Sequence, residues 1–280
     1  MLIDAHIHAL SPDRRRYPVQ PRLVEVPGAT RSWWEEAPIS AEEWLPEFSR
    51  SGVASGVLVQ AFTSYGFDNS YVADSVAARP ESFVGVGILD DTAPDAVQQM
   101  RRWVGERGLH GIRIVAAGKG KDEVLCANQV WEEAAHLRIS LSFLMNFEQI
   151  PRLRLLLDHL HEVPVVVEHA AYASAVTGPN SLVPQAFLKL SRYPLVSTKV
   201  TGMNFAALRE RGADPAKFMR QVVSAFGAER VMWGSNYPAT HDRPYADLVD
   251  EGRAVCIGLT RQEQEYVFGK TAGAVFSRVS

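Results

Sequence analysis

Residues 2–8, which read LIDAHIH, are the stretch that decides the fold. Apolar and polar residues alternate along it, as expected of a β-strand whose two faces meet different surroundings. Seven more short runs rich in apolar and β-branched residues follow, and they begin near Val53, Ser82, His110, Ile139, Pro164, Leu195 and Arg230. From the second run onward, successive starts lie 25 to 35 residues apart. That spacing is the length of one strand, one helix and two loops.

The intervals between these runs carry helical periodicity, most clearly over residues 93–105, 151–160 and 214–226. Strands that alternate with helices pair in parallel, and eight such units can close into a barrel. The sequence therefore predicts an α/β protein with one (β/α)8 TIM barrel domain over residues 1–280. An open doubly wound sheet is the competing arrangement, but the GxGxxG turn that usually follows its first strand is absent.

The first interval is longer than the others and contains an irregular segment, residues 11–40, rich in proline and with two adjacent tryptophans, Trp33 and Trp34. Long irregular loops in compact domains are usually functional or disordered, and the aromatic residues argue against disorder. We expect this segment to lie over the barrel mouth as a lid. A surface loop that packs its own tryptophan pair is the alternative.

The amino-acid composition limits the kinds of partner and the cellular setting that we expect for the protein. The chain has 29 Lys and Arg against 32 Asp and Glu, a formal net charge of -3, so it lacks the basic surface that nucleic-acid binding requires. Cys126 and Cys256 are far apart and lack CxxC spacing, which indicates neither a disulfide framework nor a thiolate zinc site. Polar residues interrupt the first ten positions, and no stretch of about 18 apolar residues occurs. We expect a cytoplasmic protein without membrane contact.

Histidines stand at the carboxyl ends of two predicted strands, where barrel enzymes build their sites. His6 and His8 share one face of the first strand together with Asp4, and His169 follows the apolar run of residues 165–167. Imidazole is the commonest neutral metal ligand, so the three histidines are candidate ligands of one divalent ion such as Zn²⁺ and candidate catalytic groups. Hydrogen-bonded or solvated histidines are the alternative. Glu168 is expected to point the opposite way, toward the helical shell.

Other polar residues interrupt apolar strands or follow them. Arg113 points into the barrel if its neighbours Ile112 and Ile114 pack outward, and its guanidinium suits a substrate carboxylate. Lys199 is a similar candidate, and for both cations an internal ion pair is the alternative. Tyr172 could border the pocket or merely cap it. His241 lies in the loop after the eighth strand, where it could act as a base, and a solvated loop residue is the alternative.

Several short motifs stand at or near the predicted strand ends: DAHIH at residues 4–8, GIR at 111–113, EH at 168–169, KVTG at 199–202 and WGSNYP at 233–238. In this order and spacing they resemble the amidohydrolase superfamily, specifically the amidohydrolase 2 branch that contains 2-pyrone-4,6-dicarboxylate lactonase, sugar lactonases and decarboxylases. Members of the branch typically have an Asp where this chain has Asn236. That Asp is a general base or a metal ligand, and an amide performs either role poorly.

The resemblance implies a hydrolase of a small, carboxylated cyclic ester, in which the histidines polarise the carbonyl while water attacks. It also implies at most one metal ion, and catalysis without metal is left open. A decarboxylase of an unsaturated or aromatic acid on the same scaffold is the second hypothesis. A non-hydrolytic member, an isomerase, a cyclase or a binding protein, is the third, because of Asn236. The partner in each case is a small acidic molecule, and a homo-oligomer is left open.

Overall fold

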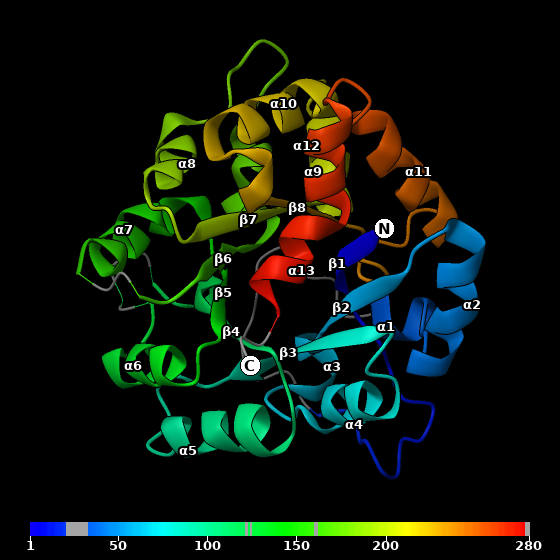
Figure 1. Ribbon diagram of the computed structural model, residues 1–280, viewed down its shortest axis with the longest axis vertical. Helices are drawn as coiled ribbons and strands as arrows, with labels where there is room; N and C mark the ends of the chain where they lie inside the picture. The colour runs from blue at the N-terminus through cyan, green and yellow to red at the C-terminus, as the bar shows by residue number, and fades with distance from the viewer. Residues whose placement is uncertain (21–32, 121–122, 124, 160–161, 278–280) are drawn as a thin grey trace.

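The computed structural model describes residues 1–20, 33–120, 123, 125–159 and 162–277. Eight strands form one parallel sheet in sequence order, β1 to β8, and helices surround them (Figure 1). The strands are β1 (Ile3–Ile7), β2 (Ser55–Val59), β3 (Phe83–Leu89), β4 (Gly111–Val115), β5 (Ser140–Leu144), β6 (Val165–Val167), β7 (Val196–Thr201) and β8 (Val231–Gly234). Each begins within two residues of its predicted start, and the predicted (β/α)8 barrel is confirmed.

Backbone hydrogen bonds join the two ends of the sheet. Asn236 N donates to His6 O at 2.8 Å, and His8 N donates to Tyr237 O at 3.0 Å. Ser235 N donates to the carboxylate of Asp4 at 2.9 Å. The chain that leaves β8 therefore lies against β1, and the barrel closes beside the histidines that the sequence marks as candidates.

The helices follow the predicted intervals. The α-helices are α1 (Trp33–Glu36), α2 (Ala41–Ser51), α3 (Phe62–Tyr65), α4 (Ser70–Ala78), α5 (Ala96–Met100), α6 (Asn128–His136), α7 (Ile150–His159), α8 (Gln185–Leu188), α9 (Gly202–Glu210), α10 (Pro215–Phe226), α11 (Tyr245–Val255), α12 (Arg261–Glu265) and α13 (Thr271–Val275). α10 begins with Pro215 in its first turn, and the Asp214 side chain caps it by accepting from Ala216 N. α5 continues as a π-helix over Arg101–Glu106, so the predicted helix 93–105 is present with a change of winding.

Two apolar clusters support the barrel. The inner cluster contains strand residues such as Val57 and Val166 together with Phe276, which follows α13 and packs with Ile3 at the amino end of β1. The outer cluster lies between the strands and the helices and includes Ile112 and Ile114 of β4. The inner cluster fills the amino-terminal half of the barrel. The polar side chains near the carboxyl ends of the strands therefore lie on a layer of apolar side chains.

The alternation predicted for β1 is broken by a register shift. Pairing with β2 is irregular between Asp4 and Ile7, as in a β-bulge. Ile3 and Ala5 belong to the inner cluster, whereas Ile7 belongs to the outer one. The prediction that Asp4 shares a face with His6 and His8 was therefore wrong. Asp4 instead accepts from Ser235 N and from the hydroxyl of Tyr245 in α11.

Within the residues that the structure describes, no helix is both long enough and apolar enough to span a membrane.

Candidate active site

A cavity of about 930 Å³ opens where the strands end. Its described lining residues come from the loops that follow β1, β2, β5, β6 and β8, from α9, and from β4, and they are His8, Trp33, Glu36, Phe62, Thr63, Arg113, Leu144, Asn146, Phe147, Glu148, His169, Tyr172, Ala175, Val176, Met203, Ala206, Ala207, Glu210, Asn236, Ala239, Thr240, His241 and Asp242. The walls are mostly apolar, and polar groups converge on the floor. That combination suits a small organic ligand.

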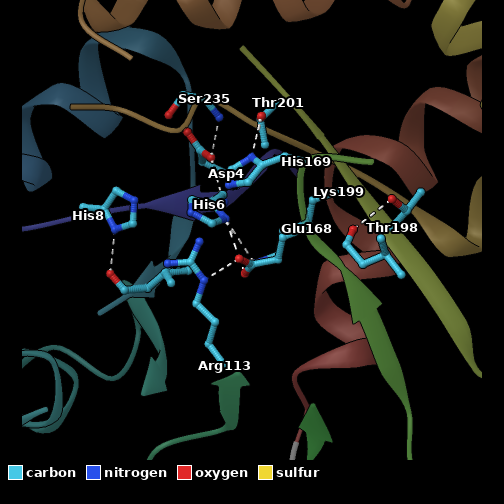
Figure 2. A network of polar contacts seen from close by, with 12 residues as sticks. Asp4, His6, His8, Arg113, Glu168, His169, Thr198, Lys199, Thr201 and Ser235 are labelled. Carbon is cyan, nitrogen blue, oxygen red and sulfur yellow. Dashed lines mark hydrogen bonds and ion pairs between the residues drawn. The ribbon is translucent and has the colours of Figure 1, made fainter. Parts of the chain in front are cut away.

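The three predicted histidines lie together at the floor of this cavity (Figure 2). The ring centroid of His6 is 5.0 Å from that of His8 and 4.7 Å from that of His169. His6 is fully buried, whereas His8 and His169 line the cavity. The structure thus brings all three side chains into one site, and their catalytic roles stay predictions.

Glu168 points into the barrel, so the prediction that it faces the helical shell was wrong. Val166 belongs to the inner cluster, and strand alternation directs Glu168 to the same side. β6 ends at Val167, and residues 169–172 have φ between 49° and 55°, a left-handed conformation that turns the chain. His169 reaches the cavity through this turn. The prediction had assumed an extended strand through His169, which would have placed the two side chains on opposite faces.

A buried ion-pair network surrounds Glu168. Arg113 Nε donates to one carboxylate oxygen, and Lys199 Nζ lies 3.4 Å from the other. Lys199 Nζ is also 3.5 Å from His6 Nδ1. Burial would raise the pKa of Glu168, but the charges of Arg113 and Lys199 outweigh burial and lower it to about 2. The carboxylate is therefore ionised, and both of its oxygens face cations.

This network changes the interpretation of both predicted substrate-binding cations. Arg113 points inward as predicted and lines the cavity, but its guanidinium is already paired with Glu168, the alternative that the sequence left open. Lys199 is fully buried below the cavity and does not line it. Lys199 is instead paired with Glu168, the alternative that the sequence left open, and its binding of a substrate stays a prediction.

Burial keeps the site histidines neutral. It lowers the pKa of His8 to about 4, with a further contribution from Arg113. It also lowers the pKa of His169 to about 3, where Arg113 and Lys199 add to it and Glu168 opposes it. Burial and the nearby Lys199 hold the pKa of His6 well below its usual range. At neutral pH these rings are unprotonated, so each has one nitrogen whose electron pair can accept a hydrogen bond or bind a metal ion.

The tautomer of His8 follows from its partner. His8 Nδ1 lies 2.9 Å from the backbone oxygen of Val59, which can only accept a hydrogen bond. Nδ1 therefore carries the proton, and Nε2 keeps its electron pair. Of the two histidines that line the cavity, His8 thus has one nitrogen fixed as a donor and the other able to take a proton from water.

Comparison with known proteins places this arrangement in a family. The family model described as Amidohydrolase matches residues 3–278, nearly the whole chain. The chain belongs to the amidohydrolase family. This amidohydrolase is also 29% identical over 206 residues to the L-fucono-1,5-lactonase of Burkholderia ambifaria, a match that covers 70% of the chain and 68% of the relative.

Solved structures agree on the fold. An amidohydrolase from Burkholderia multivorans with bound zinc has a TM-score of 0.75 and 19% identity, with 99% of each chain covered. A probable 2-pyrone-4,6-dicarboxylic acid hydrolase from Acinetobacter baumannii, with citric acid bound, has a TM-score of 0.74 and 18% identity, with 98% of each chain covered. Solved decarboxylases share the fold with lower similarity. At these identities the structures support the fold of this amidohydrolase and not its substrate.

A donor set for a metal ion is present, although it differs from the predicted one. Donor atoms of His6, Glu168 and His169 lie within 4.8 Å of one another, and all three residues are buried. Two imidazoles and a carboxylate are ligands that Zn²⁺ accepts. His6 Nε2 is buried without a hydrogen-bond partner among the described residues, as expected of a nitrogen reserved for a ligand. The residues fit a divalent ion, with Glu168 in the place predicted for His8.

Asn236 lies at the cavity floor of this amidohydrolase. It is 2% exposed, has φ of 64°, and donates from Nδ2 to the Thr240 hydroxyl at 3.0 Å. His241, the other predicted base, is at the rim, where Nε2 lies 2.9 Å from the Glu36 carboxylate and Nδ1 lies 2.9 Å from Pro238 O. Both of its nitrogens are engaged. His241 is therefore a weaker candidate for the base than His8.

Two further predictions concern the wall. Tyr172 borders the cavity, its ring centroid lies 5.9 Å from that of His169, and burial raises the pKa of its hydroxyl to about 12. The phenol therefore stays protonated.

Of the predicted lid, Trp33 and Glu36 line the cavity, and the ring centroid of Trp33 lies 5.3 Å from that of His8. Residues 21–32 of that segment lie outside the described residues, so the lid stays a prediction.

Proposed function

We propose that this amidohydrolase is a lactonase that hydrolyses a small, neutral, hydroxylated cyclic ester. The observation that carries the proposal is the lining of the cavity. Two neutral imidazoles, His8 and His169, face the space for a ligand, and Arg113, the one Lys or Arg among the described lining residues, is already paired with Glu168. The similarity to an L-fucono-1,5-lactonase supports the same reaction class. Ester hydrolysis needs a proton acceptor for water and a group that polarises the carbonyl.

His8 is the proposed general base. Its Nδ1 proton is fixed on Val59 O, so Nε2 can remove a proton from a water molecule that attacks the lactone carbonyl. The ring-opened product is a hydroxy acid, and the proton that His8 takes from water can pass to the leaving alkoxide oxygen.

The charge of the cavity favours a neutral substrate over the carboxylated one predicted from the sequence. Arg113 is the one Lys or Arg among the described lining residues, and Glu168 occupies it. The rim carries four acidic residues, Glu36, Glu148, Glu210 and Asp242, of which Asp242 is paired with Arg243 and Glu36 faces His241. Like charges repel an anion at the entrance, whereas hydroxyl groups can donate hydrogen bonds to these carboxylates. A carboxylated lactone is therefore the second candidate for this site.

The test is a substrate panel. A neutral aldono-1,5-lactone, 2-pyrone-4,6-dicarboxylate and 2,6-dihydroxybenzoate are offered to the wild type, and acid or CO₂ release is followed. We expect hydrolysis of the neutral lactone, with kcat/KM at least tenfold above that of the dicarboxylate. His8→Asn should reduce kcat about 10²- to 10⁴-fold, the usual contribution of a general base. His136→Asn, an exposed histidine of α6, is the matched control. Faster turnover of the dicarboxylate, or CO₂ release alone, rejects the proposal.

We further propose that His6, Glu168 and His169 hold one divalent ion such as Zn²⁺. Such an ion supplies Lewis-acid polarisation of the lactone carbonyl when bound. Lys199 competes with it for Glu168, because its ammonium lies 3.4 Å from Glu168 Oε1.

Lys199→Met is therefore expected to bind Zn²⁺ about tenfold more tightly than the wild type, a difference of about 1.4 kcal/mol. The affinity is measured by competition with a chromophoric chelator. Lys270→Met, which removes an exposed lysine paired with Glu265, is the control and should leave the affinity unchanged. Equal or weaker binding by Lys199→Met argues against competition, and no binding by the wild type argues against the ion site.

The neutral histidines also predict how stability depends on pH. The pKa is about 4 for His8 and about 3 for His169 in the folded protein, against roughly 6.5 in an unfolded chain. Between these values the unfolded chain binds protons that the folded chain does not, so the free energy of unfolding falls as pH is lowered below roughly 6.5. Each imidazole contributes up to about 1.4 kcal/mol per pH unit. Asp4 opposes this trend below pH 6, because burial raises its pKa to about 6.

Urea denaturation of metal-free protein at several pH values between 7.5 and 5.0 measures this slope. The variant His8→Asn should show a shallower slope than the wild type, since one imidazole no longer contributes. A stability that is constant or rises toward pH 5 contradicts the burial of neutral rings.

A further inference from the structure

We infer that Thr201 and Asn204 are positioning residues that fix the orientation and tautomer of the His169 ring. Thr201 is the last residue of β7, and Asn204 lies in the first turn of α9. Both side chains are fully buried and face His169. They were not recognised in the sequence, because KVTG reads as the end of a strand and the polar pair resembles an ordinary helix cap.

Asn204 is oriented by four contacts. Its Nδ2 donates to His169 O at 2.7 Å and to the Ser174 hydroxyl at 2.9 Å, which uses both of its hydrogens. Its Oδ1 accepts from Thr201 N at 2.9 Å and lies 3.3 Å from the Thr201 hydroxyl oxygen. The amide therefore presents its oxygen to Thr201.

This orientation determines where the protons lie. The Thr201 hydroxyl has one hydrogen, and only one arrangement makes both of its side-chain contacts hydrogen bonds: the hydrogen points to Asn204 Oδ1, which can only accept, because His169 Nδ1 is able to donate. The hydroxyl oxygen is then an acceptor toward His169 Nδ1, which lies 2.9 Å away (Figure 2). His169 Nδ1 consequently carries the ring proton, and Nε2 keeps the free electron pair.

The same contacts support the backbone of this segment. Residues His169–Tyr172 adopt left-handed conformations that residues with a side chain rarely take, and the bond from Asn204 to His169 O is made where this run begins. Asn204 thus connects the position of the backbone with the proton on the ring. Partners of this kind fix the tautomer and the direction of an active-site imidazole.

The inference rests on the proposed function only in assigning His169 a role in turnover. Its central claim concerns the ring proton and can be measured without a substrate. Protein labelled with ¹⁵N-histidine gives separate Nδ1 and Nε2 signals for each ring, and the variant His169→Gln identifies those of residue 169.

The test compares Thr201→Val, which has the same shape but no hydroxyl, with Thr201→Ser, which keeps the hydroxyl. In the wild type and in Thr201→Ser, the signals of His169 should be those of a neutral ring protonated at Nδ1. In Thr201→Val they should move toward a mixture of tautomers. kcat for the neutral lactone should fall about 10- to 100-fold in Thr201→Val, with KM within twofold of the wild type, and Thr201→Ser should retain activity. Thr201→Ala replaces the valine variant if the latter does not fold.

Unchanged His169 signals in Thr201→Val overturn the inference, as does a wild-type ring protonated at Nε2. Altered signals combined with an unaltered kcat overturn the positioning role. If the wild type hydrolyses no lactone but the signals behave as expected, the proposed function fails and the assignment of the ring proton stands.

Discussion

Asn236→Asp is expected to raise kcat/KM for lactone hydrolysis by about two to four orders of magnitude, the usual contribution of a positioned general base. Asn236 lines the same cavity as His8 and His169, and a carboxylate there could take a proton from the attacking water. The substitution is sterically conservative. Asp tolerates the left-handed backbone at this position, with φ of 64°, about as well as Asn does.

The local hydrogen bond also survives the change. Asn236 Nδ2 now donates to the Thr240 hydroxyl, and after substitution the same hydroxyl can rotate and donate to the new carboxylate. Asn146→Asp adds an equal charge to the cavity wall on the loop after β5, and it is the control for charge alone. Initial rates of acid release from the neutral lactone measure both variants.

If Asn236→Asp raises kcat/KM and Asn146→Asp does not, the Asn236 amide limits the rate at which water is activated. No gain, or a loss, means that the Asn236 amide orients the substrate, and that His8 alone serves as the base.

The sequence was sufficient to predict the barrel because the signals for it are local. Strand length, helix periodicity and spacing recur eight times, and each strand start was located to within two residues. The same local reasoning located His6, His8 and His169 at the carboxyl ends of their strands. What brings them together is the closure between β1 and β8, which follows from the eightfold repeat.

The errors arose where a strand departs from ideal alternation. The register shift in β1 separates Asp4 from His6, and the left-handed turn after β6 allows both Glu168 and His169 to point inward. Neither irregularity leaves a sequence signal in a chain without glycine at these positions. The run from Val166 to Glu168 did carry one usable clue, because an inward Val166 requires an inward Glu168.

Arg113→Met is expected to destabilise the folded protein by about 3–5 kcal/mol. Removing one partner of a buried ion pair leaves the other charge without compensation. Glu168 is fully buried, and after the substitution it would keep only Lys199, at 3.4 Å, as a cationic partner. Urea denaturation gives the free energy of unfolding.

Two further variants test whether the loss of stability in Arg113→Met comes from leaving a buried charge unpaired or from losing any ion pair. Arg261→Met breaks the pair with Glu265 in α12, where the two side chains are 95% and 42% exposed, and it should change stability little. Arg113→Met combined with Glu168→Leu should be more stable than Arg113→Met alone, because it removes the unpaired carboxylate.

Kinetics of Arg113→Met then decide the role of the guanidinium. If its main partner is Glu168, loss of Arg113 should lower kcat through a disturbed His6 and His169, and KM for a neutral lactone should change little. If Arg113→Met instead destabilises the fold by less than about 1 kcal/mol and raises KM strongly for a carboxylated lactone but not for a neutral one, the result would support Arg113 as the residue that binds a substrate carboxylate. That outcome would mean that the ion pair with Glu168 opens when substrate enters, and that Arg113 exchanges one carboxylate for another.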